Sequence, residues 1–362
     1  MTRQAASLYS ASTDLSADSI ESHPGTRGLF ALGTYQVDQA QEEGQPADEN
    51  SNTSPEYSRR GRLTLHQTGT DGEGKVSCRT LSSLDTAAIL DMKWLASGSR
   101  LSAALATSDL AFFHLNKGSL SPADTLKMND VGALCLSLDW SDRRGLGAEG
   151  GSGPTKGIVS QSDGSLAYIP DLEVALSSKG NIESWAAHDY EAWIAAWDCW
   201  SDGNICWSGG DDLTLKGWDV REASRQPTFQ VRKAFEGGVT TLQSHHLRQH
   251  LWAVGSYDGH LRLFDARKPL RPLSSTNVGG GVWRAKWHPT DSESLLVGCM
   301  HDGFKILKLP NDPASGDMDV MVRFDEHQSL AYGCDWDRSL SEPCSHVYSC
   351  SFYDSRLHIW EA

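Results

Sequence analysis

Several short segments of the chain place an aromatic ring close to a carboxyl group or an imidazole. His188, Asp189, Glu191 and Trp193 follow one another within the segment AHDYEAW. Carboxylates and imidazoles are common general acids and bases, and aromatic faces attract cations. Similar side chains occur further along the chain at Asp211, Tyr257, Trp283, His301, Tyr332 and Phe352. Together these residue types favour a site that binds a cation and transfers a proton.

The elements that must position these residues come from an internal repeat. One pattern is shared by SGGDDLTLKGWD (208–219), VGSYDGHLRLFD (254–265), VGCMHDGFKIL (297–307) and SCSFYDSRLHIWE (349–361), with VSQSDGSLAYI (159–169) as a weaker copy. Each segment has a small-residue strand end, a tight turn and an alternating strand. The turn positions are 43 to 53 residues apart. A period of about 40 to 50 residues with Trp-Asp endings is typical of WD40 propeller blades.

Alternation with a period of two predicts strands in these segments, and no sustained helical stripe occurs. We therefore predict an all-β protein, a seven-bladed WD40 β-propeller that occupies residues 1–362 as a single domain. The predicted blades are 24–67, 76–117, 124–171, 180–228, 229–273, 274–311 and 320–362. The last blade lacks an outer strand, which the N-terminal segment 8–20 could supply. Such a closure would remove exposed sheet edges.

Two stretches interrupt the repeat. Residues 37–61 and 142–157 are rich in Gly, Pro, Ser and charged residues and show no apolar periodicity. This composition predicts disordered loop insertions, the first of them a solvated hairpin insertion.

One face of the predicted propeller gathers the aromatic residues. The loop that enters the first strand of a blade and the turn between its second and third strands meet there, close to the axis. The position after the first small apolar residue of the first strand is held by Trp193, Thr240, Trp283 and Tyr332. The position before the turn residue is held by Asp211, Tyr257, Met300 and Phe352. We predict an aromatic pocket with acidic groups at its edge, suited to a quaternary ammonium ligand.

Packing is the alternative interpretation of each aromatic residue. Trp193 alternates in step with Ala195 and Trp197, so all three side chains could fill the core. Because aliphatic residues commonly fill blade cores, the binding role is favoured for Trp193, Trp283 and Tyr332 taken together.

Two histidines have different expected roles. His188 lies where a WD40 blade places a histidine that is hydrogen-bonded to the turn aspartate and a serine, here Asp212 and Ser208, with Trp218 alongside. This structural role is favoured over catalysis. His301 replaces the turn aspartate of the neighbouring repeats, which puts an imidazole on the ligand-binding face. An imidazole is a usual general base near neutral pH, although a turn variant without a role fits as well.

Composition and missing motifs exclude several classes of function. The chain has 32 Lys and Arg against 47 Asp and Glu, a formal net charge of −15, whereas a nucleic-acid binder needs a basic footprint. No apolar run of about 18 residues and no secretory signal are visible, so no membrane contact is predicted. Eight Cys without a Cys-x-x-Cys pair favour a reduced cytosolic protein. The absence of GxSxG, GxxxxGKS/T and GxGxxG motifs excludes α/β-hydrolase and nucleotide-binding folds.

Neither a metal nor another cofactor is predicted. His245, His246 and His250 lie in one polar loop, but their spacing is too weak a signal to assign a metal. A closed ring has no edge that requires pairing, which favours a monomer.

Several segments closely resemble one particular WD-repeat family. They are AHDYEAWIAAWDCW with SGGDDLTLKGWDVR, GSYDGHLRLFDARKPLRPL, GGGVWRAKWHP, CMHDGFKIL and SCSFYDSRLHIWE, together with the early segments DLSADSIESHP, LFALGTYQV and RRGRLTLHQ. The chain resembles the diphthine methyl ester esterases of diphthamide biosynthesis, called diphthine methyltransferases in older naming. GGGVWRAKWHP with CMHDGFKIL is far more specific than a Trp-Asp dipeptide, and the resemblance covers nearly the whole chain.

The resemblance implies a eukaryotic cytosolic enzyme that acts on translation elongation factor 2. Its substrate would be a modified histidine with a trimethylammonium group and a methyl ester, and water would cleave the ester to give diphthine and methanol. Ester hydrolysis needs a base and donors for the oxyanion. We favour His301 or Glu191 as the base, with His188 and Asp189 as further candidates. The N–H groups of Gly279, Gly280 and Gly281 are the candidate oxyanion donors.

A second hypothesis belongs to another class of function. Propellers are often scaffolds, and the chain has no nucleophile motif, so a non-catalytic adaptor that holds elongation factor 2 with another pathway enzyme also fits the sequence.

Overall fold

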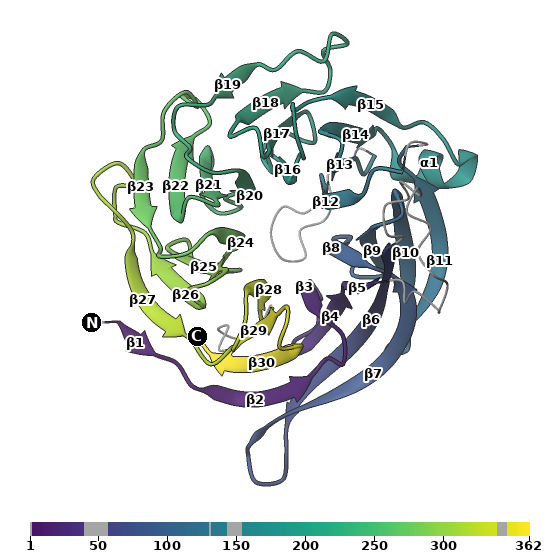
Figure 1. Ribbon diagram of the computed structural model, residues 1–362, viewed down its shortest axis with the longest axis vertical. Helices are drawn as coiled ribbons and strands as arrows, with labels where there is room; N and C mark the ends of the chain where they lie inside the picture. Colours follow the sequence, from purple (N-terminus) through teal and green to yellow (C-terminus); the bar gives the residue numbers. More distant parts are fainter. Residues whose placement is uncertain (1, 40–56, 130–131, 143–153, 339–345) are drawn as a thin grey trace, which may run out of the picture.

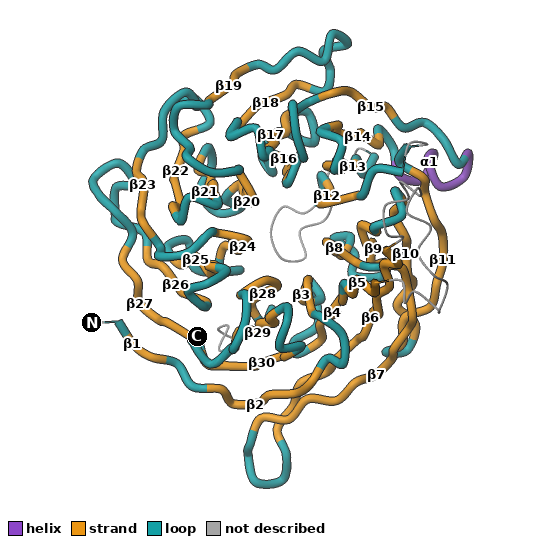
Figure 2. The backbone as a smooth tube through the Cα atoms, in the orientation of Figure 1, coloured by secondary structure: helices purple, strands orange, loops and turns teal. Residues whose placement is uncertain are grey.

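Seven antiparallel sheets surround one axis in the computed structural model of the chain (Figure 1). The structure describes residues 2–39, 57–129, 132–142, 154–338 and 346–362. Within each sheet the strands follow one another outward from the axis, so that the sheets stand as blades (Figure 2). The prediction of an all-β, seven-bladed propeller is confirmed.

The first three blades come from the N-terminal half of the chain, and the strand nearest the axis is named the inner strand. Blade 1 contains β3 (Ala17–Ser22), β4 (Leu29–Thr34), β6 (Tyr57–Thr70) and β7 (Val76–Ala87), with β5 (Gln36–Gln39) paired to β6. Blade 2 contains β8 (Ile89–Trp94), β9 (Arg100–Leu105), β10 (Asp109–Asn116) and β11 (Ser119–Lys127). Blade 3 contains β12 (Cys135–Trp140), β13 (Gly157–Gln161), β14 (Ser165–Ile169) and β15 (Glu183–Ala186). The one helix of the described residues, α1 (Leu172–Ser178), lies at the periphery of the ring (Figure 2).

The remaining four blades complete the ring. Blade 4 contains β16 (Ile194–Trp197), β17 (Ile205–Gly209), β18 (Leu215–Asp219) and β19 (Phe229–Val231). Blade 5 contains β20 (Val239–Ser244), β21 (Leu251–Ser256), β22 (His260–Asp265) and β23 (Ser274–Asn277). Blade 6 contains β24 (Val282–Trp287), β25 (Ser294–Cys299), β26 (Phe304–Lys308) and β27 (Asp319–Phe324). Blade 7 contains β28 (Ala331–Trp336), β29 (His346–Ser351), β30 (Arg356–Glu361) and β2 (Ser7–Ser12).

The N-terminal segment joins two blades that come from the C-terminal end of the chain. β2 pairs antiparallel with β30, for example Ser10 opposite His358, and is the outer strand of blade 7. β1 (Arg3–Gln4) pairs parallel with β27, with Arg3 opposite Val322. These pairings cover sheet edges that would otherwise be exposed. The predicted closing segment 8–20 is therefore divided, because its second half begins β3, the inner strand of blade 1.

The predicted blade ranges differ from the observed sheets by one strand. The range 229–273 spans β19 to β22, whereas blade 5 consists of β20 to β23. Each sequence repeat thus begins with the outer strand of one blade and continues with three strands of the next. A period looks the same wherever its start is placed, so strand pairing decides where a blade begins. The range 24–67 also omits β3, and this strand carries a residue of the candidate site.

The two predicted insertions lie partly outside the described residues, at 40–56 and 143–153. At their flanks the structure differs from the predicted loops. β5 pairs with the start of β6, with Val37 opposite Arg59, and β13 begins at Gly157. Polar sequence can continue as strand here because a paired neighbour satisfies its backbone groups.

Each interface between neighbouring blades buries its own hydrophobic cluster. Between blades 4 and 5, Trp207 stacks on Trp252 with ring centroids 4.3 Å apart and planes 6° apart. Between blades 6 and 7, Phe324 stacks on Trp360 at 5.0 Å. Because such interiors are close-packed, they hold the inner strands in fixed positions around the axis.

Candidate functional site

One ring of residues lies where the inner strands begin. In blades 1, 2, 3, 5, 6 and 7 the pairing between the inner strand and its neighbour shifts directly after the first inner-strand residue. A bulged residue leaves the ladder, which can re-aim its side chain. This position is held by Asp18, Leu90, Leu136, Thr240, Trp283 and Tyr332, and in blade 4 Trp193 directly precedes β16. We call these seven residues the entry ring.

The aromatic members of the entry ring contact one another and two further rings. Trp193 and Trp283 have centroids 5.8 Å apart, and Tyr257 lies 6.0 Å from Trp193 and 5.9 Å from Trp283. Tyr332 lies 4.9 Å from Trp283 and 5.0 Å from Phe352. All five side chains are partly buried, neither sealed in the core nor fully exposed. We call these five residues the aromatic cluster, and they are the five aromatic residues singled out from the sequence.

A carboxylate borders the aromatic cluster. Asp211 is exposed, and its Oδ1 accepts a hydrogen bond of 3.0 Å from Trp193 Nε1. A Cβ at Gly238 would lie 2.5 Å from this oxygen, so a larger residue there would have to displace the Asp211 carboxylate. Burial raises the pKa of Tyr257 to about 12, so its phenol stays neutral at physiological pH. The edge of the cluster thus combines aromatic faces with a negative charge, which suits a cation.

A second charged pair lies beside Trp283. The guanidinium of Arg284 is 5.4 Å from the Trp283 ring centroid and donates to Leu90 O at 2.9 Å. Its Nη2 also lies 3.8 Å from Asp18 Oδ1. Trp283 therefore already carries a cation beside its ring.

Asp18 is the charged member of the entry ring, and it is not among the candidates drawn from the sequence. It is only 4% exposed, and its Oδ1 has no hydrogen-bond partner among the described residues. Burial raises its pKa to about 7, although the charge of Arg284 opposes the rise and that of Asp91 adds to it. A signal was present, because Asp18 follows Ala17 as Trp193 follows Ala192. The prediction that residues 8–20 form the closing strand conceals this signal, because Asp18 falls inside that range.

His188 has the structural role favoured from the sequence. Its Nδ1 lies 2.9 Å from Asp212 Oδ1 and its Nε2 lies 2.7 Å from Ser208 Oγ. Trp218 Nε1 donates to the same Ser208 oxygen at 2.8 Å. The imidazole is buried and both of its nitrogens are engaged, so the predicted hydrogen-bond network is confirmed.

His301 is exposed and lies in a separate depression of the surface. The depression has a volume of about 850 Å³ and is lined by His301, Asp302, Arg323, His327 and Tyr353, among others. It adjoins the aromatic cluster through Tyr353, whose ring lies 5.0 Å from that of Phe352. His301 thus stays a candidate at the border of the cluster.

The two remaining acid candidates lie at the entry to blade 4. Glu191 is partly buried, and its backbone carbonyl accepts a 2.8 Å hydrogen bond from the Asp211 N–H. Asp189 has a side chain that is 75% exposed, and its Oδ2 lies 3.6 Å from Arg232. Glu191 therefore contacts Asp211, which borders the aromatic cluster, whereas Asp189 faces the exposed Arg232.

The three candidate oxyanion donors lie at the entry to blade 6. The Gly279 N–H donates to Asn277 Oδ1 at 2.9 Å, so this group is already used. Gly280 and Gly281 follow directly and lead into β24. A Cβ at Gly281 would lie 3.2 Å from both Met300 Sδ and Tyr257 Cδ1, which places this backbone against the aromatic cluster.

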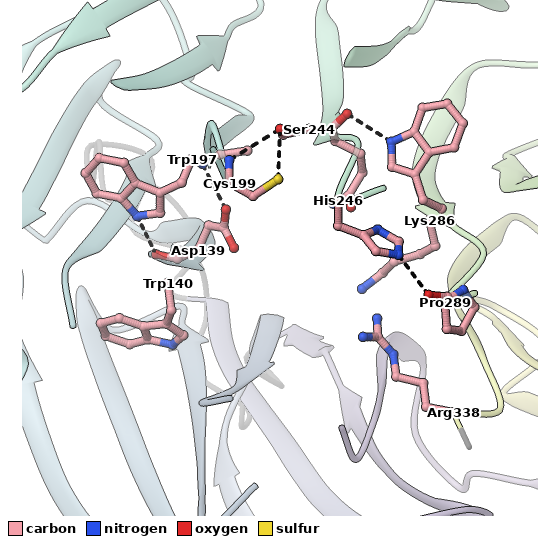
Figure 3. A pocket seen from close by; sticks show the side chains of 12 residues that line it. Asp139, Trp140, Trp197, Cys199, Ser244, His246, Lys286, Pro289 and Arg338 are labelled. Atoms are coloured by element: carbon pink, nitrogen blue, oxygen red, sulfur yellow. Dashed lines mark hydrogen bonds between the residues drawn. The ribbon is translucent and has the colours of Figure 1, made fainter. Parts of the chain in front are cut away.

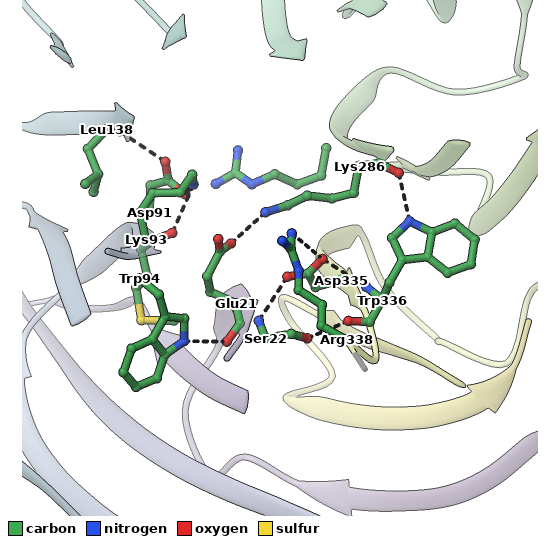
Figure 4. A network of polar contacts seen from close by, with 12 residues as sticks. Glu21, Ser22, Asp91, Lys93, Trp94, Leu138, Lys286, Asp335, Trp336 and Arg338 are labelled. Atoms are coloured by element: carbon green, nitrogen blue, oxygen red, sulfur yellow. Dashed lines mark hydrogen bonds and ion pairs between the residues drawn. The ribbon is translucent and has the colours of Figure 1, made fainter. Parts of the chain in front are cut away.

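The opposite end of the inner strands holds a different constellation. A cavity of about 70 Å³ is lined by residues that follow or end these strands, including Trp197, His246, Lys286 and Arg338 (Figure 3). Nearby, Lys286 Nζ lies 2.6 Å from Glu21 Oε2, and Lys93 Nζ lies 2.6 Å from Asp91 Oδ1 (Figure 4). Because these buried charges pair with one another, we interpret this end as a structural network.

The described residues offer no metal cluster, and burial keeps two of their thiols protonated. No three His, Cys, Asp or Glu side chains of the described ranges come together as a metal site. Burial raises the pKa of Cys78 and of Cys299 to about 12, so these thiols stay protonated and are poor nucleophiles. No helix within those ranges is long and apolar enough to cross a membrane.

Comparisons with known proteins give relatives along nearly the whole chain. No protein-family model matches the chain. "Diphthine methyltransferase" of Homo sapiens is 37% identical over 360 residues, which cover 95% of this chain and 77% of that protein. The protein of the same name from Schizosaccharomyces pombe is 30% identical over 353 residues, with 96% and 95% covered. "Diphthine methyltransferase homolog" of Dictyostelium discoideum is also 30% identical, over 381 residues, with 96% of each chain covered.

A solved structure supports the architecture. A chain in the crystal structure of a mitotic checkpoint complex matches with a TM-score of 0.67 at 16% sequence identity, covering 98% of this chain and 91% of that one. At this identity the likeness concerns the fold alone.

Proposed function

This chain belongs to the diphthine methyltransferase family, and from that premise we propose that it is an esterase that removes the methyl ester from methylated diphthine on translation elongation factor 2. Family membership assigns the chain a role in diphthamide biosynthesis. The proposed substrate is a modified histidine that carries a trimethylammonium group and a methyl ester. The proposed products are diphthine and methanol, formed in the cytosol by a monomeric enzyme without a cofactor.

The aromatic cluster is the observation that carries this proposal. A quaternary ammonium has no N–H to donate, so aromatic faces and a nearby carboxylate are what recognise it. Trp193 and Tyr257 offer two such faces, and Asp211 adds the carboxylate beside Trp193. A site that recognises the trimethylammonium group would hold the ester of the same side chain close to the entry ring.

The chemistry of the proposed reaction is the attack of water on a carboxylic ester. The water loses a proton as it attacks the carbonyl, and the oxyanion that forms needs donors. The tetrahedral intermediate then expels methoxide, which leaves as methanol after it takes up a proton. Among the sequence-based candidates, His301 and Glu191 remain proposed bases, and the N–H groups of Gly280 and Gly281 remain proposed donors.

The proposal is tested by methanol release from elongation factor 2 that carries the methyl ester. Incubation with the purified chain, without a methyl donor, is expected to release one methanol per modified histidine and to lower the mass of the factor by one methylene. A mass increase that depends on an added methyl donor would instead establish methyl transfer and overturn the proposal.

A non-catalytic adaptor is the second candidate. Exposed Tyr190 and Tyr353, which are 64% and 74% exposed, flank the site and suit contact with a protein surface. An adaptor binds methyl-ester-bearing elongation factor 2 without releasing methanol. The same incubation, combined with a pull-down of the factor, therefore separates the two functions.

A further inference from the structure

We propose that Asp18 is the general base of the ester hydrolysis, a role that rests on the proposed function. This assigns the reaction centre to the entry ring beside the aromatic cluster, at the junction of blades 1 and 7. Neither Asp18 nor its strand was among the candidates drawn from the sequence.

The position of Asp18 in the ring carries the inference. Asp18 occupies in blade 1 the place that Tyr332 holds in the adjacent blade 7 and that Trp283 holds in blade 6. β3 and β28 approach closely, since a Cβ at Gly333 would lie 2.8 Å from Asp18 O. Tyr332 is therefore the member of the aromatic cluster next to Asp18 in the ring, and an ester bound against Tyr332 would lie beside the Asp18 carboxyl group.

The carboxyl group of Asp18 is buried, and one of its oxygens has no hydrogen-bond partner in the described part of the chain. Its Oδ1 makes no hydrogen bond within the described chain and faces Arg284 Nη2 at 3.8 Å, longer than a hydrogen bond. Buried polar atoms are nearly always hydrogen-bonded, so an exception calls for an explanation, and a role in chemistry is one of them. The side chain keeps 6% exposure, so it lies at the margin of the buried region. Trp283 Nε1 is a second buried polar atom without a partner in the described ranges, and it belongs to the same cluster.

The electrostatic surroundings suit a base that works near neutral pH. The titratable groups around Asp18 are Arg284 of β24, Asp91 of β8, Tyr332 of β28, Tyr257 after β21 and Cys350 of β29. Burial is the main cause that raises the pKa of Asp18 to about 7, and burial also keeps both phenols neutral. A base with this pKa is half ionised at neutral pH and can both accept and return a proton.

The other acid–base candidates are engaged or less enclosed. Both nitrogens of His188 are hydrogen-bonded to Asp212 and Ser208. His301 is exposed in the neighbouring depression. Asp18 alone among these candidates combines burial, a place in the entry ring and an oxygen without a hydrogen-bond partner.

The proposed reaction is hydrolysis of the methyl ester with Asp18 as the general base. Ionised Asp18 takes a proton from water while the water oxygen bonds to the ester carbonyl carbon, and the carbonyl electrons move onto oxygen. Arg284 supplies positive charge close to this oxyanion. The intermediate then re-forms the carbonyl and breaks the bond to the methoxy oxygen, which takes the proton from Asp18. Methanol and a carboxylic acid result, and the acid releases its proton to water.

The decisive experiment compares the full-length chain with its Asp18→Asn variant on methyl-ester-bearing elongation factor 2. We expect kcat to fall at least about a hundredfold, with KM changed less than about threefold, because a general base acts in the chemical step. The wild-type kcat/KM should fall tenfold per pH unit below about pH 7, and the variant should lose this dependence.

A stability measurement distinguishes catalysis from a structural role. The folded-state pKa of Asp18 is raised above its unfolded value, so its ionised form is disfavoured in the folded protein above pH 7. Asp18→Asn should therefore unfold at the same or a higher urea concentration than wild type at pH 8, and this advantage should shrink as pH falls below 7.

Asp335→Asn is the matched control. Asp335 is a buried aspartate of β28 that accepts hydrogen bonds from Ser22 N and Trp336 N, so its substitution should lower stability and leave the pH dependence of kcat/KM intact.

Each outcome decides between the claims. A wild-type chain that releases no methanol contradicts the proposed function itself. Methanol release by wild type together with an Asp18→Asn rate within threefold of it overturns the role of Asp18 and leaves the function standing. Loss of activity accompanied by lowered stability at pH 8 also overturns it, since Asp18 would then be a structural residue.

Discussion

Single aromatic side chains carry the cation-binding part of the proposed function. Trp283 contacts three of the other four cluster members, Trp193, Tyr257 and Tyr332. We expect Trp283→Ala to raise KM for methyl-ester-bearing elongation factor 2 about tenfold, because a cation–π contact is worth about 0.5–2 kcal/mol. The change in kcat should be smaller. Steady-state methanol release at varied substrate concentration measures both.

Trp185→Ala is the matched control for this prediction. Trp185 lies on the outer strand β15, where it also has a cation beside its ring, Arg225 at 5.1 Å. The Trp185→Ala variant loses the same kind of ring at a place outside the aromatic cluster, so its KM should stay unchanged. Equal KM values for the Trp283 variant and wild type would contradict a cation-binding cluster.

At the scale of elements, the turn after β20 links blades 5 and 6 through a buried histidine. His245 Nε2 lies 3.1 Å from Ser292 O, and its Nδ1 accepts a 3.0 Å hydrogen bond from Leu247 N. The ring stacks on Trp287 with centroids 4.2 Å apart. This geometry requires a neutral imidazole, because protonation of Nδ1 would remove the acceptor. Burial lowers the pKa of His245 to about 4.

The depressed pKa predicts a loss of stability in acid. The unfolded histidine has a pKa near 6.5, so the unfolded state takes up the proton first and folding is disfavoured as pH falls from about 6.5 toward 4. We expect wild type to lose about 1–2 kcal/mol more than His245→Gln in unfolding free energy between pH 7 and pH 5. Urea unfolding at both pH values measures this difference.

His114→Gln provides the comparison, since His114 of β10 is only partly buried. Both variants and wild type keep Asp18, so its opposite pH dependence cancels between them. If wild type and His245→Gln lost the same unfolding free energy between pH 7 and pH 5, His245 would not be the cause of the acid sensitivity.

At the scale of the whole molecule, the N-terminal strands hold the ring closed. β2 covers the edge of β30, whereas β1 adds two residues beside β27. Deletion of residues 1–12 should lower the melting temperature by roughly 5 °C or more and promote self-association, because it uncovers a long sheet edge. Deletion of residues 1–4 should have a much smaller effect. Thermal unfolding and size-exclusion chromatography test both, and equal melting temperatures for the two deletions would contradict the closing role of β2.

Much of the fold could be predicted because it is repeated locally. The turn that contains Asp258 and the strand HLRLFD after it recur in sequence, and each copy contains its own alternation and turn chemistry. The pairing of β2 with β30 is different, since it joins the two ends of the chain and no periodicity marks it. The predicted blade boundaries differ from the observed ones by one strand, because a repeat does not show where each unit begins.

The sequence by itself determined the propeller, the residues of the aromatic cluster and the hydrogen-bonded place of His188, because local spacing specifies each of them. Only the tertiary structure decided that Asp18 joins the entry ring and faces Arg284. These two residues lie on β3 and β24, which are far apart in the chain. Burial and the charge of distant neighbours set the pKa of a carboxyl group, and both exist only after the ring has closed.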